Sequence, residues 1–66
     1  MKIVTYKVQF RHSDQWITDY IGNNETVMIQ QAIWRKERNP NETIRVVEQM
    51  DDGNGIMGRE MPVFFA

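Results

Sequence analysis

One stretch of this chain, residues 25–38, lacks Gly and Pro and spaces its apolar residues as a helix does. Four apolar side chains fall on one stripe at about 100° per residue: Met28, Ile29, Ala32 and Ile33. Pro40 ends the helix, because the residue before a proline avoids helical backbone angles. The segment therefore predicts one amphipathic helix whose apolar stripe packs against a sheet.

The segments on both sides of the predicted helix alternate as β-strands do. Residues 3–11 and 16–21 predict two strands joined by a polar turn at 12–15. Residues 43–49 predict a third strand after the helix. The apolar end of the chain, Met61–Phe65, can add a fourth strand at the sheet edge, because an edge strand tolerates a proline.

The alternation also indicates which side chains face the helix. In the third strand, Ile44 and Val46 are expected inward, which places Arg45 and Val47 outward. The first strand completes the expected core with Val4, Tyr6, Val8 and Phe10. The fold class expected is α+β: a single antiparallel sheet of three to four strands, with one helix packed on one face, in the order β-β-α-β.

Composition limits the chain to one small domain, residues 1–66, held together by its apolar core. With 66 residues, no cysteine and one histidine, there is no disulfide framework and no Cys/His zinc site. A formal net charge of −1 lacks the strongly basic signature of general nucleic-acid binders. Its apolar runs are too short for a membrane span or a signal peptide, so a cytoplasmic location is expected.

No motif in the chain predicts catalysis, a metal or a cofactor. His12, Ser13 and Asp14 are consecutive, whereas a hydrolase triad converges from separate positions. The acidic turn at residues 51–55 lacks the glycine and glutamate that a calcium loop needs at its sixth and twelfth positions. We therefore expect neither an enzyme nor a cofactor-binding protein.

The outward face of the predicted helix carries an unusual apolar pair. Val27 and Trp34 lie seven residues apart, roughly opposite the apolar stripe. Tryptophan beside arginine is typical of binding hot spots, which predicts a partner-binding surface made of Val27, Gln31, Trp34, Arg35 and Arg38. The alternative is that the C-terminal segment covers Trp34 and makes it part of the core. In that case the hairpin becomes the next candidate, through Lys7, Gln9, Arg11 and Asp19.

The order and size of the predicted elements resemble small phage-encoded host-takeover inhibitors, such as the T7-type inhibitors of bacterial RNA polymerase. The resemblance covers residues 6–48 and includes Ala32-Ile33-Trp34 near the helix end and Ile44-Arg45-Val46-Val47 in the strand that follows. Phage antitoxins that block a host RNA-cleaving toxin are similar in size and order. The resemblance implies an inhibitor or adaptor that acts by protein contact, and it leaves the target open.

We therefore expect a non-enzymatic protein-binding module whose partner is a host protein, with the host cytoplasm as its location if the chain is viral. The chain itself is expected to be a monomer or a homodimer. One alternative is a small nucleic-acid-binding protein that uses Trp34, Arg35, Lys36 and Arg38. Another is a homo-oligomeric accessory protein that pairs through the edge of its C-terminal strand.

Overall fold

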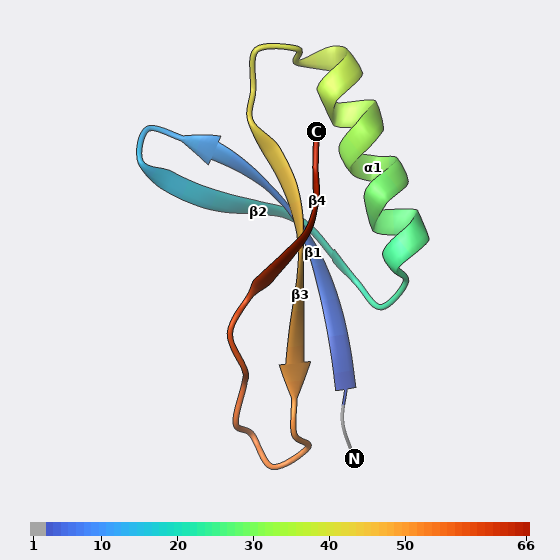
Figure 1. The fold of residues 1–66 in the computed structure, drawn as a ribbon, viewed down its shortest axis with the longest axis vertical. Coiled ribbons are helices and arrows are strands. Elements are labelled where there is room, and N and C mark those ends of the chain that lie inside the picture. The colour runs from blue at the N-terminus through green and yellow to red at the C-terminus, as the bar shows by residue number, and fades with distance from the viewer. Residues whose placement is uncertain (1–2) are drawn as a thin grey trace.

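The computed structural model describes residues 3–66 as one antiparallel sheet with a helix on one face (Figure 1). The elements follow the order β1 (Ile3–His12), β2 (Gln15–Gly22), α1 (Glu25–Arg38), β3 (Ile44–Asp51) and β4 (Met61–Phe65). In space the strands are ordered β2-β1-β3-β4, so β1 lies between β2 and β3. The predicted α+β fold is confirmed, including the fourth strand at the edge.

The β1–β2 hairpin turns through only two residues, Ser13 and Asp14. Ser13 has a φ of 56°, the left-handed conformation that two-residue hairpin turns require. Farther along β2 the register shifts, because Val8 pairs with Tyr20 while Gln9 pairs with Thr18. Asp19 is the extra residue of this β-bulge, and the bulge directs its carboxylate toward α1.

The ends of α1 lie where the sequence predicts them. The side chain of Asn24 caps the first turn by accepting a hydrogen bond from the backbone N–H of Val27 at 3.1 Å. At the other end the backbone N–H of Asn39 donates to the carbonyl of Arg35, one residue before Pro40. The basic last turn and the acidic first residue, Glu25, both complement the helix dipole.

The core lies between α1 and the two central strands. Its buried members are Val8, Met28, Ala32, Ile44 and Val46, and five partly buried side chains pack against them: Tyr6, Phe10, Ile29, Phe64 and Ala66. Most of the predicted core is confirmed. Val4 and Ile33 are only half-buried and stand outside this cluster, because α1 presents Met28 and Ala32, rather than Ile33, to the sheet.

One residue predicted to face outward is fully buried. Val47 points to the face of the sheet opposite α1, yet its exposed fraction is 0%. The alternation placed it on the correct face, but on that face the connection between β3 and β4 brings Glu60 within 3.0 Å of Lys7, the strand partner of Val47. Figure 1 shows this connection at the end of the molecule away from the α1–β3 loop, where the sheet extends beyond the helix.

Within residues 3–66 no helix is long and apolar enough to cross a membrane.

Candidate protein-binding surfaces

The outward face of α1 exposes the apolar pair that the helical periodicity identifies. Val27 is 46% exposed and Trp34 is 48% exposed, and Arg38 beside them is also exposed. The C-terminal strand pairs with β3 and leaves Trp34 open, so Trp34 is not a core residue. Gln31, one turn from each of the pair, is half-buried.

Arg35 is held inside the protein rather than displayed on this surface. Its guanidinium donates to both carboxylate oxygens of Glu42, at 2.8 and 3.1 Å, and to Asp19 at 2.8 Å. The same group lies 3.9 Å from the centre of the Phe10 ring. The hydrogen bond to Glu42 is the main cause that raises the pKa of Arg35. Arg35 thus fixes the end of the helix to the β2 bulge and to the loop before β3. It lies next to the outward face of α1 and holds that face in position.

The other two cations at the end of α1 differ from Arg35. Lys36 donates to the backbone carbonyl of Glu42 at 2.6 Å, so it also ties the helix to the loop that follows. Arg38 takes part in none of the ion pairs found among residues 3–66. Of the three cations in the nucleic-acid alternative, Arg38 is therefore the one that makes the fewest contacts within the fold.

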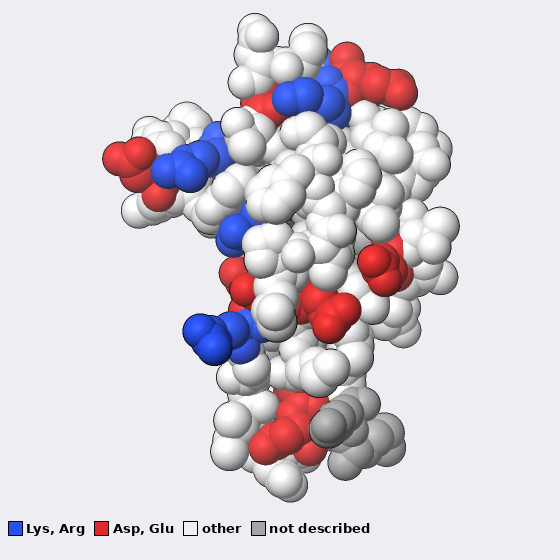
Figure 2. Space-filling model, viewed as in Figure 1, with Lys and Arg blue, Asp and Glu red and all other residues white. Residues whose placement is uncertain are grey.

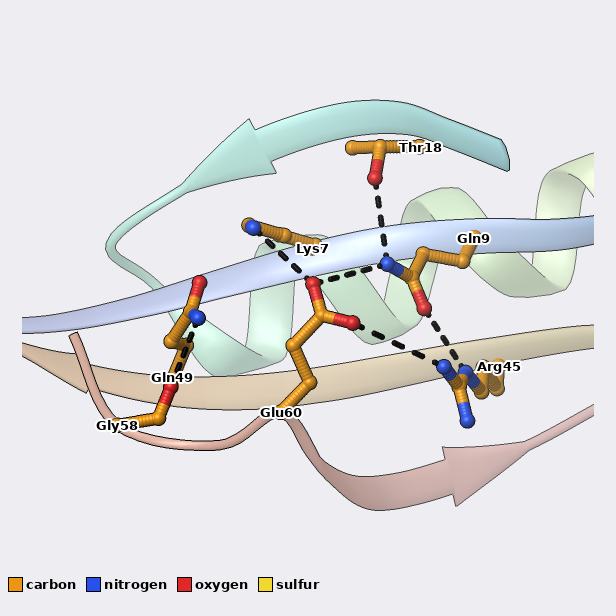
Figure 3. A network of polar contacts seen from close by, with 7 residues as sticks. All are labelled: Lys7, Gln9, Thr18, Arg45, Gln49, Gly58 and Glu60. Carbon is orange, nitrogen blue, oxygen red and sulfur yellow. Dashed lines mark hydrogen bonds and ion pairs between the residues drawn. The ribbon is translucent and has the colours of Figure 1, made fainter. Parts of the chain in front are cut away.

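The face of the sheet opposite α1 carries a polar network centred on Glu60 (Figure 3). Oε2 of Glu60 accepts from Nζ of Lys7 at 3.0 Å and from Nε2 of Gln9 at 3.2 Å. Oε1 of the same carboxylate lies 3.9 Å from Nη2 of Arg45. Burial raises the pKa of Glu60, but the hydrogen bonds from Lys7 and Gln9 and the nearby positive charges outweigh it, so the net pKa lies below its ordinary value.

The partners of Glu60 are themselves fixed by neighbouring side chains. Gln9 is only 3% exposed, and its amide nitrogen also donates to the hydroxyl of Thr18 at 3.2 Å. Its amide oxygen accepts from Nε of Arg45 at 2.8 Å. The Arg45 guanidinium stacks on Trp16, 4.1 Å from the ring centre, and Arg11 approaches the same ring at 5.7 Å. Burial lowers the pKa of Arg45, and the charge of Glu60 opposes this effect.

The structure divides the hairpin residues named as a second candidate surface. Lys7 and Gln9 meet on the open face through Glu60, and Arg11 lies on that face near the hairpin turn. Asp19 lies on the other face, bound to Arg35. The sequence gives no signal for Glu60, because its partners Lys7 and Gln9 are 53 and 51 residues away.

Two shallow hollows lie along the β3–β4 connection and share Met50 and Gly58. The first, of about 220 Å³, is also lined by Asp51, Asp52 and Ile56; the second, of about 230 Å³, is also lined by Glu48, Arg59 and Met61. Within the described residues 3–66, no three His, Asp or Glu side chains gather as metal ligands do.

Comparison with known proteins adds no identification. No protein family matches the chain, and no curated protein or solved structure matches it either.

Proposed function

We propose that this chain is a non-enzymatic protein-binding module that contacts its partner through the outward face of α1. The observation that carries the proposal is the exposure of Trp34, at 48%, on a helix whose opposite side already packs against the sheet. The contact surface consists of Val27, Gln31, Trp34 and Arg38, with Arg35 beside it as the residue that fixes the end of α1.

The physical support for this surface is its composition and its rigidity. Tryptophan and arginine are enriched among interface residues whose truncation weakens binding most. Val27 and Trp34 stand two turns apart on one face, so a single partner surface can contact both. Because Arg35 and Lys36 fix the end of α1 to the loop before β3, this face needs little ordering when it binds.

The finer part of the proposal is that the partner is a bacterial enzyme or defence complex that the chain inhibits by direct contact. Its support is the resemblance in size and element order to phage-encoded inhibitors. The nucleic-acid alternative has less support, because Glu42 and Asp19 neutralise Arg35. Figure 2 shows Lys and Arg interspersed with Asp and Glu on the face in view, without a broad region of one sign.

The test compares tagged wild-type chain with a Trp34→Ala variant in pull-downs from a bacterial lysate. The wild type is expected to capture one protein in stoichiometric amount, and Trp34→Ala to lose it while its circular dichroism spectrum stays the same. Thr26→Ala, an exposed change on the same helix about 100° around the axis from Val27, is the matched control and retains capture.

Capture of the same protein by Trp34→Ala would overturn the assignment to this face. If Trp34→Ala unfolds, Val27→Gln tests the same surface through a smaller, equally exposed side chain. Recovery of nucleic acid that is lost steeply between low and physiological salt would favour the alternative instead.

A further inference from the structure

The side chain of Glu60 reaches past the neighbouring strand β3 to bond with residues of β1. It precedes β4 at the edge, yet its carboxylate bonds to Lys7 and Gln9 on β1, with β3 lying between (Figure 3). The contact between Glu60 and Lys7 therefore lies beside Val47, which pairs with Lys7 on one side and with Pro62 on the other.

Two of the three groups that receive this carboxylate, Gln9 and Arg45, are held in place by other contacts. Gln9 is fixed by Thr18 on one side and by Arg45 on the other. Arg45 is positioned by its stack on Trp16, and its side chain is only 16% exposed. These contacts do not involve Glu60, so withdrawal of Glu60 would leave its binding groups largely organised. Such preorganised donors favour binding of an anion because little entropy is lost on contact.

The segment that carries Glu60 is held loosely. Residues 52–59 are all exposed. They join β3 through an isolated bridge between Asp51 and Met57 and through hydrogen bonds: Gly58 donates its N–H to the carbonyl of Met50 and accepts from Gln49, and Gly53 donates to the carboxylate of Asp51. Exposed segments with few buried contacts open most readily in native proteins. We call residues 52–60 the strap.

The closed strap also leaves a polar atom unsatisfied. Nε2 of Gln49 donates to the carbonyl of Gly58 at 2.9 Å, but Oε1 of Gln49 is buried and has no hydrogen-bond partner in the described part of the chain. A buried acceptor without a partner disfavours the state that buries it. Opening of the strap would give this oxygen access to water and so offset part of the contacts that are lost.

We propose that Lys7, Gln9 and Arg45 form a carboxylate-binding site, that Glu60 occupies it within the chain, and that the strap withdraws to admit an acidic side chain of a partner protein. The chemistry of the ligand follows from the group now bound, which is a carboxylate. Charge favours the same ligand, because without Glu60 this face retains Lys7, Arg11 and Arg45, against the carboxylates of Asp14, 3.8 Å from Arg11, and of Asp51 at the far end of β3. The site lies on the opposite face of the sheet from α1, so it does not rest on the role proposed for Trp34.

The test uses the full chain and a Glu60→Ala variant, titrated with a short capped peptide that contains one glutamate. Binding is followed by NMR through the side-chain amide of Gln9 and the indole of Trp16. An internal competitor weakens apparent affinity in proportion to the closed population, so Glu60→Ala should bind the peptide more tightly by about tenfold or more. The same peptide with glutamine in place of glutamate is the ligand control and should not bind.

Two results would overturn the proposal: equal affinity of wild type and Glu60→Ala for the glutamate peptide, or equal binding of the glutamate and glutamine peptides. If Glu60→Ala does not fold, Glu60→Gln provides the comparison: it keeps the side-chain length and removes the charge, and because its amide oxygen can still accept from Lys7 and Gln9, a smaller gain in affinity is expected. Trp34→Ala should leave peptide affinity unchanged, which separates failure of this site from failure of the α1 surface.

Discussion

Arg35 lies on the helix beside the proposed binding residues, but its side chain bonds to other parts of the fold. Helical periodicity places it beside Gln31 and Arg38, and that placement is right. Its two carboxylate partners lie 16 and 7 residues away, on a β-bulge and in a loop. No local pattern reports such a contact, because the bulge itself arises from the pairing of β1 with β2. The sequence therefore predicts the position of Arg35 on the helix but not its hydrogen bonds to Asp19 and Glu42.

Replacement of Arg35 by alanine should destabilise the fold more than replacement of Arg38. Arg35→Ala leaves Asp19 and Glu42 as neighbouring carboxylates without their cation, and it removes the stack on Phe10. We expect a loss of about 1.5–3 kcal/mol in the free energy of unfolding, the range for hydrogen bonds to charged groups. Arg38→Ala, the exposed control, should change it by less than about 0.5 kcal/mol. Urea unfolding of both variants measures the difference, and equal losses would contradict this role of Arg35.

At the scale of elements, the boundaries were predictable because they depend on neighbouring residues. The helix begins after an asparagine cap and ends before Pro40, and both signals are local. The hairpin followed from alternation and turn residues in the same way, and the edge strand β4 followed from the apolar end of the chain. What alternation could not predict was the burial of Val47, because one of its strand partners is Pro62, 15 residues later in the chain.

The cap of α1 gives a prediction with a neighbouring control. Asn24→Ala removes the side-chain oxygen that accepts from the N–H of Val27 and should cost about 1 kcal/mol of stability. Asn23→Ala changes an exposed residue outside the helix and should cost little. Thermal unfolding of the two variants tests the assignment. An equal loss in both would mean that the first turn of α1 is capped by some other group.

At the scale of the whole molecule, stability should depend on acid through Glu60. Its pKa lies below the ordinary value of 4.5, because the hydrogen bonds and charges of Lys7, Gln9 and Arg45 outweigh the burial that raises it. The stabilisation is therefore fully present above pH 4.5 and is lost as the pH falls through the lower pKa of the folded state. Urea unfolding should show wild type more stable than Glu60→Gln at neutral pH, with the gap closing in acid. A gap that stays constant down to the acid limit would contradict this linkage.

The position of β1 in the middle of the sheet also determines the order in which the molecule can assemble. The hairpin of β1 and β2 needs only nearby residues, so it can form early. The other edge of β1 pairs only with β3, whose residue Val46 comes 38 positions after its partner Val8 in the chain. Until that long loop closes, β1 has a partner strand on one edge only, and the hairpin alone is marginal in water. We therefore expect the pairing of β3 with β1 to be the rate-limiting event in folding.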